Sequence, residues 1–140
     1  MTQINPYLNF DGNCREAMAF YKECFGGELV MMPFEGSPME DQVPAEAKQH
    51  IMHANLINGG LVLMASDSLS CELKRGNAIT LSINCSSTAE IDTFFGNLSK
   101  DGNITMPLSE QFWGAKFGML TDKFGVNWML NYDKAPKENA

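Results

Sequence analysis

The chain has 140 residues, a net charge of −7 and a pI near 4.7, with 44% hydrophobic and 19% charged residues. This length suits one domain or two small, tightly associated modules, and the apolar content is too high for a disordered chain. The acidic balance repels nucleic-acid phosphates, and no apolar run approaches the roughly 18 residues that cross a bilayer, so we expect neither a nucleic-acid partner nor a membrane span.

The cysteines and the N-terminal stretch favour a reducing, cytoplasmic environment. No CxxC pair occurs, and the cysteine spacing resembles neither a zinc site nor a disulfide framework. The opening stretch MTQINPYLNF lacks the basic region and apolar run of a secretory signal. We therefore expect a soluble cytoplasmic protein with four free thiols, at Cys14, Cys24, Cys71 and Cys85.

The first part of the chain predicts a strand, a helix and a second strand. Residues 4–10 alternate between two faces, and Tyr7 lies on the face opposite the large apolar residues. The stretch CREAMAFYKECF repeats its apolar residues at helical spacing, Asn13 is placed to cap its start, and Gly26-Gly27 ends it. Residues 28–34 are typical of a strand.

The next part predicts an excursion followed by a hairpin. Residues 35–49 are acidic, contain two prolines and hold no run of core-forming residues, so we expect an exposed excursion with a short helical turn at 44–48. Strands at 51–57 and 61–65 are joined through Asn58-Gly59-Gly60, which is a strong hairpin signal.

The order of elements then begins again. Ser86-Ser87-Thr88 followed by Glu90 is close to a capping box, which predicts the start of a helix, and Asp101-Gly102 ends that helix. Each half therefore reads as strand, helix and three strands, and one half alone cannot cover its own sheet. The strands of the second half are expected at residues 78–84, 103–106, 113–120 and 126–132.

Two stretches carry a resemblance to a known family. NFDGNCREAMAFYKECFGGEL and FWGAKFGMLTDKFGVNWM resemble the glyoxalase/bleomycin-resistance/dioxygenase (vicinal oxygen chelate) superfamily, and within it the PhnB-like, demethylubiquinone-methyltransferase-like branch, over residues 3–133. The resemblance implies an α+β fold of two βαβββ modules, residues 1–70 and 76–133, forming a curved mixed sheet around a cleft. It also implies a homodimer. Residues 134–140 are expected to be a frayed tail.

The resemblance also implies where a metal would bind. Superfamily enzymes usually hold a divalent metal through His or Glu on the first and last strands of each module. Thioether and alkyl groups do not hold such ions in water, so we expect no metal and no cofactor here. No glycine-rich loop supports the methyltransferase label either. The residues at the metal positions are Asn5 or Pro6, Met64, Ala78 or Ile79, and Met129.

Four residues are candidates for chemistry. His53, in the strand IMHANLI, is either an acid/base group or ligand contact in the cleft, or a hydrogen-bonded histidine beside a sheet. Asp67 either lies at the cleft mouth or caps a turn. Glu110 lies on a loop that either closes over a ligand or is solvated. Cys14, at a helix start, is a weaker candidate for a nucleophile because no histidine is near it in sequence.

Aromatic and methionine side chains suggest a ligand-binding cleft. We expect Tyr7, His53, Trp113 and Trp128 to contact a small molecule, although aromatic residues on sheets usually pack in the core. The leading hypothesis is metal-free binding of a small apolar or amphipathic molecule. The alternatives are a metal-dependent lyase, isomerase or dioxygenase with an atypical site around His53, and a dimeric scaffold. Methionines that form either pocket wall or core are Met31, Met52, Met64, Met119 and Met129.

Overall fold

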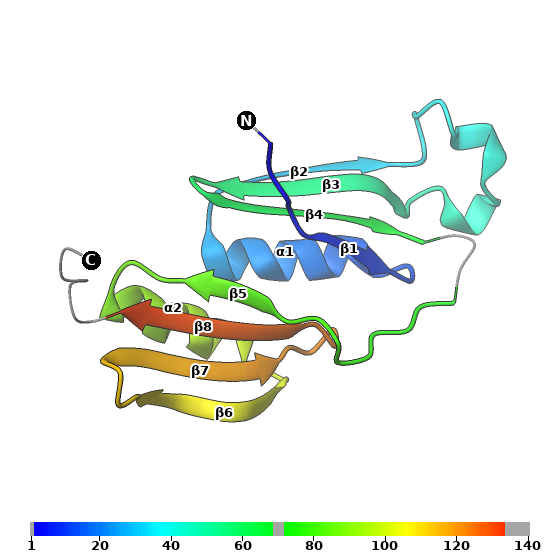
Figure 1. The fold of residues 1–140 in the computed structure, drawn as a ribbon. Helices are drawn as coiled ribbons and strands as arrows, with labels where there is room; N and C mark the ends of the chain where they lie inside the picture. The colour runs from blue at the N-terminus through cyan, green and yellow to red at the C-terminus, as the bar shows by residue number, and fades with distance from the viewer. Residues whose placement is uncertain (1, 69–71, 134–140) are drawn as a thin grey trace. The chain divides into compact units, whose positions relative to one another are not determined.

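The computed structural model describes residues 2–68 and 72–133, which belong to two compact units (Figure 1). The first unit is Met1–Lys74 and the second is Arg75–Ala140. Each contains one α-helix and a four-stranded mixed sheet, so the predicted α+β fold with a βαβββ repeat is confirmed. Cys71 and the expected tail at 134–140 lie outside the described residues. No helix in the described part of the chain is long and apolar enough to span a bilayer.

The first unit follows the predicted order. Strands β1 and β4 are parallel, and the other neighbours are antiparallel, in the sheet order β1-β4-β3-β2. The predicted hairpin through Asn58-Gly59-Gly60 joins β3 to β4. The elements are β1 (Tyr7–Phe10), α1 (Cys14–Phe25), β2 (Glu28–Pro33), β3 (Ile51–Asn58) and β4 (Leu61–Asp67).

Helix α1 covers one face of this sheet (Figure 1). The predicted helical spacing is confirmed, because Ala17, Phe20, Tyr21 and Cys24 are all buried. In β1 the buried and exposed residues alternate, and Phe10 is fully buried. The apolar residues of the strands therefore form a core with α1, and the residues between them lie on the opposite face of the sheet.

The start of α1 is capped from a distant strand. Asn13 occupies the predicted N-cap position, but its side chain makes no capping hydrogen bond. Instead Oδ1 of Asp67 accepts hydrogen bonds from the backbone amides of Gly12 and Cys14, both at 2.9 Å. Its Oδ2 accepts a third from the Ile51 amide at 2.8 Å. The end of β4 thereby supplies the cap that the local sequence does not.

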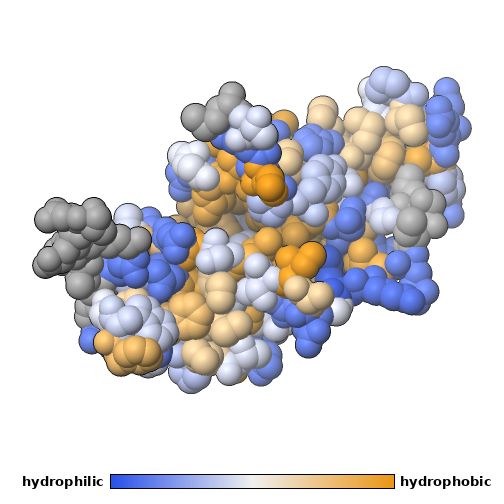
Figure 2. All heavy atoms as spheres, viewed as in Figure 1, coloured by the Kyte–Doolittle hydropathy of each residue, from blue (hydrophilic) through white to orange (hydrophobic). Residues whose placement is uncertain are grey.

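The excursion after β2 has a small core of its own. The predicted helical turn is confirmed as the 3₁₀ helix η2 (Ala45–Ala47). Another 3₁₀ helix, η1 (Glu40–Gln42), precedes it in the chain. Most of the segment is exposed, as expected, but Val43 and Ala47 are buried against Phe34, with Met52 packed beside them. Figure 2 shows apolar atoms among the polar ones at the upper right, where this segment lies. A few apolar residues inside a polar stretch are enough to fold it back on itself.

The second unit repeats the topology. Its sheet order is β5-β8-β7-β6, with β5 parallel to β8 and the other neighbours antiparallel. Helix α2 packs against β7 and β8. The elements are β5 (Leu81–Asn84), α2 (Thr88–Leu98), β6 (Asn103–Glu110), β7 (Ala115–Thr121) and β8 (Asn127–Asp133).

Three boundaries in the second unit differ from the prediction. Strand β6 continues through Pro107 to Glu110, because a proline is tolerated in an edge strand and the register shifts there. Strand β5 begins at Leu81, and Ile79 before it is 76% exposed. Helix α2 ends at Leu98, and the residues after it form the turn that leads to β6.

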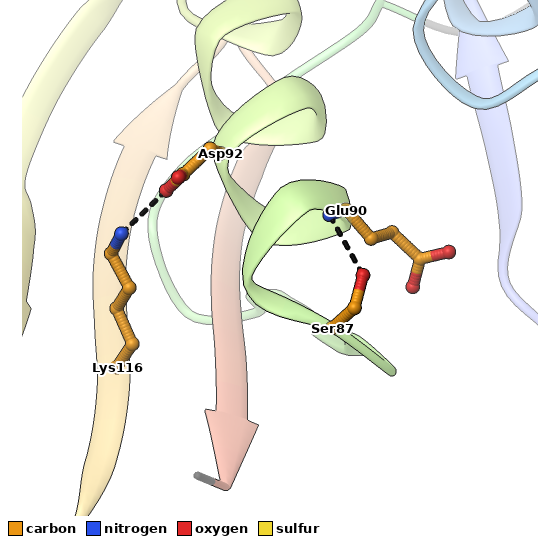
Figure 3. A network of polar contacts seen from close by, with 4 residues as sticks. All are labelled: Ser87, Glu90, Asp92 and Lys116. Carbon is orange, nitrogen blue, oxygen red and sulfur yellow. Dashed lines mark hydrogen bonds and ion pairs between the residues drawn. The ribbon is translucent and has the colours of Figure 1, made fainter.

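The predicted capping box at the start of α2 is confirmed (Figure 3). The backbone amide of Glu90 donates to Oγ of Ser87 at 3.0 Å, and Oε1 of Glu90 accepts from the Ser86 amide at 2.9 Å. One turn further along, Asp92 pairs with Lys116 of β7 at 2.6 Å. This contact ties the helix surface to the sheet beneath it.

Candidate functional site

We call the side of the first sheet that faces away from α1 the helix-free face. The pairing registers place successive side chains of neighbouring strands on it, with Tyr7 opposite Met64, Met64 opposite Asn55, and Asn55 opposite Val30. The buried residues Leu8, Ala65 and Ala54 alternate with them and face the core. The helix-free face is defined by Tyr7, Val30, Met32, His53, Asn55 and Met64.

Two of the predicted ligand contacts meet on this face. Oη of Tyr7 lies 3.1 Å from Nδ1 of His53, and the ring centroids are 5.7 Å apart. Tyr7 comes from β1 and His53 from β3, which flank β4 in the sheet. Tyr7 is 43% exposed and His53 is half-buried, so the pair is available to a small molecule.

Methionines border the Tyr7–His53 pair. Met64 is the register partner of Tyr7, and Met32 is the register partner of His53. Met32 is 43% exposed and Met64 is partly buried. Their flexible, polarizable side chains place an adaptable apolar surface beside two polar groups.

Trp113 lies in the loop between β6 and β7 of the second unit. The loop is closed by the Gln111 amide, which donates to the Ala115 carbonyl at 2.7 Å. The Trp113 ring meets Phe112 edge to face at a centroid distance of 5.0 Å and contacts Phe117 at 6.5 Å. It is 54% exposed, so its ring is accessible.

Trp128 does not line a surface, and the prediction for it is wrong. Its side chain is 3% exposed, and its indole Nε1 donates to Oδ2 of Asp122 at 2.8 Å. In β8, Trp128 and Leu130 are both buried and lie on the side that packs against α2. Met129 between them faces the other way. The alternation of strand residues separates two faces but does not say which one a helix covers.

Two further candidates are structural. Cys14 is fully buried, and that burial, reinforced by the neighbouring Asp67 carboxylate, raises the pKa of its thiol to about 12. The thiol is protonated at neutral pH, so the nucleophile hypothesis for it is wrong. Asp67 is 4% exposed with both oxygens bonded to backbone amides, so it caps a helix and does not stand at a cleft mouth.

Glu110 and the superfamily metal positions offer little for catalysis. Glu110 is the last residue of the edge strand β6, opposite Lys116 of β7. Met64 projects from β4 onto the helix-free face, and Met129 occupies the matching place on β8. A thioether does not fit the usual hard divalent ions. Within residues 2–68 and 72–133, no three His, Cys, Asp or Glu side chains gather as a ligand set.

Comparisons with known proteins agree with this architecture. The sequence profile of the 3-demethylubiquinone-9 3-methyltransferase family matches residues 2–131. Protein YjdN of Escherichia coli strain K12 is 36% identical, covering 94% of this chain and 95% of that protein. The crystal structure of PA1353 from Pseudomonas aeruginosa has a TM-score of 0.85 at 44% identity, covering 96% of this chain and 100% of the other.

Further solved structures, one similar in sequence and others distant, have the same fold. The PhnB protein of Bacillus cereus has a TM-score of 0.76 at 33% identity, covering 94% of this chain and 99% of the other. Solved structures of glyoxalase/bleomycin resistance/dioxygenase proteins share the fold at low sequence identity. The chain therefore belongs to the 3-demethylubiquinone-9 3-methyltransferase family, a PhnB-like group with the glyoxalase/bleomycin resistance/dioxygenase fold.

Proposed function

We propose that the protein binds a small amphipathic molecule on the helix-free face of its first sheet. The observation that supports this most directly is the hydrogen-bonded pair of Tyr7 and His53 beside Met32 and Met64. Binding sites for small molecules combine an apolar lining with a few placed polar groups, and this face has both. Trp113, which belongs to the second unit, is proposed separately as a ligand contact because its ring is exposed.

The same proposal assigns no metal to the site. It is supported by the thioethers of Met64 and Met129, which stand at strand positions where the superfamily's enzymes carry ligands. Carboxylate or imidazole ligands are what zinc, nickel, manganese and iron require. Elemental analysis of protein purified without chelators tests this part, and stoichiometric bound transition metal would contradict it.

Native mass spectrometry of protein purified from its own host tests the ligand. We expect a bound small molecule on the wild type and its loss in Tyr7→Ala. Ile104→Ala is the matched control, because Ile104 is 46% exposed, close to the 43% of Tyr7, but lies on β6 of the other unit. The proposal fails if both variants retain the ligand equally, or if none of the three proteins carries one.

A second candidate function is an enzyme that uses His53 as an acid or base. The phenol and imidazole at 3.1 Å support it, because such a pair can hold and move a proton. Incubating the co-purified molecule with fresh protein and following its mass would test the idea. Turnover by the wild type that His53→Gln abolishes would support it, whereas equal turnover by both proteins would eliminate His53 as the catalytic residue.

We also propose a cytoplasmic homodimer, either as the ligand-binding form or as a scaffold. Its support is the exposure of large apolar side chains, at 99% for Ile4, 96% for Phe112 and 76% for Ile79. A cytoplasmic location is supported by the buried thiols of Cys14 and Cys85, which form no disulfide. Light scattering is expected to give twice the chain mass, with Phe112→Ser shifted towards monomer. A monomeric wild type at micromolar concentration would contradict the proposal.

A further inference from the structure

We propose that His53 presents the Nε2–H of a neutral imidazole to the ligand, so that the bound molecule carries an uncharged hydrogen-bond acceptor, such as a ketone, ester or amide carbonyl. This inference rests on the function proposed above and specifies the polar end of the ligand. Its basis is the hydrogen bond between Oη of Tyr7 and Nδ1 of His53, the partners of His53, and the charges on the four strands.

The chemistry of the two partners indicates which tautomer of His53 to assign. Oη of Tyr7 lies 3.1 Å from Nδ1 of His53, within hydrogen-bond distance. A phenolic O–H is a better donor than acceptor, because the ring withdraws electron density from the oxygen. Tyr7 therefore donates to an unprotonated Nδ1. A neutral imidazole has one N–H, which must then be on Nε2, and Tyr7 acts as the positioning residue.

The Nε2–H of His53 is left for a ligand. Tyr7 is the one hydrogen-bond partner of His53 in the part of the chain that the structure describes. Nε2 is also not among the buried polar atoms that lack a partner, so solvent reaches it. The register partners nearby, Met32 and Met64, offer only thioether sulfur, which is a weak acceptor. A stronger acceptor on the ligand can therefore accept a hydrogen bond from the Nε2–H of His53 without displacing a protein group.

The charges on the strands favour a neutral acceptor over an anion. Strands β1 to β4 read YLNF, ELVMMP, IMHANLIN and LVLMASD, and none contains lysine or arginine. The strand acids are Glu28 and the fully engaged Asp67, and the chain carries a net charge of −7. A carboxylate or phosphate would leave water without a cation on these strands to pair with it. A carbonyl oxygen needs only a donor.

Nuclear magnetic resonance of protein with isotope-labelled histidine tests the tautomer without any ligand. The ring nitrogen signals of His53 are expected to show Nε2 protonated and Nδ1 accepting, with His50 as an internal comparison. In Tyr7→Phe we expect the Nδ1–H form to gain population, because the phenyl ring cannot donate to Nδ1. A proton mainly on Nδ1 of His53 in the wild type would overturn the inference.

Three ten-carbon probes test the acceptor: methyl octyl ketone, decanoate and decylammonium. We expect the ketone to move the Nε2 signal of His53, decanoate to move it less, and decylammonium to leave it in place. Tyr7→Phe should weaken ketone binding about five- to tenfold, the scale of one hydrogen bond. An equal or larger response to decanoate or to decylammonium would overturn the uncharged-acceptor assignment.

The outcomes separate this inference from the proposed function. A proton on Nδ1 of His53, in protein whose own ligand is still lost in Tyr7→Ala, refutes the inference and leaves the function standing. If the proton lies on Nε2 but no probe moves the His53 signal and no molecule co-purifies from the host, the proposed ligand-binding function is refuted. The assignment of an uncharged acceptor on the ligand is then refuted as well.

Discussion

Asp67 shows how one buried side chain can hold several elements of the first unit. Its two oxygens accept three backbone hydrogen bonds, from the start of α1 and from the first residue of β3. The three donors come from residues 12, 14 and 51, so the carboxylate joins three parts of the chain. We therefore regard it as the central polar contact of this unit.

Replacing Asp67 should be costly. Asp67→Ala leaves backbone amides at Gly12, Cys14 and Ile51 without an acceptor, and we expect the free energy of unfolding to fall by about 3 kcal/mol. Urea denaturation measures this. Asp11→Ala is a suitable control because Asp11 is exposed in the same turn. Equal stability of the two variants would show that the carboxylate is dispensable.

The buried thiols predict a stability change at high pH. Burial raises the pKa of Cys14 and of Cys85 to about 12, against 9.0 for an ordinary thiol, with smaller contributions from Asp67 and Glu90 respectively. Between these values the unfolded chain loses the protons while the folded chain keeps them. The stabilisation is therefore complete below pH 9 and is lost as the pH rises towards 12.

Denaturant titrations at a series of pH values measure this loss. The comparison is with the double variant Cys14→Ala/Cys85→Ala, which lacks both thiols and keeps every other titratable group. We expect the decline in unfolding free energy between pH 9 and 12 to be shallower in that variant. Identical slopes would mean that the thiols ionise freely in the folded protein.

At the scale of elements, the two helices start in different ways. Ser87 caps α2 with its own side chain, whereas Asn13 makes no side-chain cap on α1. Ser87→Ala should therefore lower the free energy of unfolding by about 1 kcal/mol, and Asn13→Ala by only a few tenths. Thermal unfolding of the two variants makes the comparison, and a larger loss for Asn13→Ala would contradict it.

Two glycines of the second unit form a matched pair. A Cβ on Gly118 of β7 would come within 2.7 Å of the Phe95 ring of α2 and 3.0 Å of Leu108, so Gly118→Ala should destabilise by about 1–3 kcal/mol. A Cβ on Gly96 within α2 meets nothing within 4 Å, so Gly96→Ala should stabilise by about 0.5–1 kcal/mol. Chemical denaturation measures the change in the free energy of unfolding for both variants. Changes of the same sign in the two would refute the packing argument.

Local patterns predict the elements well where one face is buried and poorly where the contact is distant. The alternation in β1 and the spacing in α1 predict which residues are buried, and Asn58-Gly59-Gly60 predicts the hairpin. Strand β6 extends beyond its predicted end, because an edge position removes the penalty on Pro107. The Asp67 cap joins residues 53 positions apart, and no local pattern contains it.

At the scale of the whole molecule, the chain consists of two units with the same topology, each with one α-helix packed on its own sheet. The sequence pattern predicts only part of the geometry at the candidate site. Tyr7 and His53 were identifiable because polar residues interrupt apolar strands, and their register brings them together. Trp128 was misplaced because the repeat does not indicate which face of β8 receives α2.

Hydrogen exchange of backbone amides should report the two cores separately. The central strands β3 and β4 in the first unit, and β7 and β8 in the second, are expected to exchange slowest, because neighbours pair with them on both sides. The edge strand β6, whose residues are mostly exposed, should exchange faster. Slow exchange confined to one unit would contradict the expectation of a protected sheet in each unit.

The excursion after β2 has a consequence for engineering. Its stem is closed by the Phe34 amide donating to the His50 carbonyl at 3.0 Å and the Glu35 amide donating to the Lys48 carbonyl at 2.8 Å. Beyond that stem, Val43 and Ala47 pack on Phe34. We therefore expect that a foreign loop or tag can replace the segment beyond these two hydrogen bonds. The strands β2 and β3 on either side of it should keep their pairing.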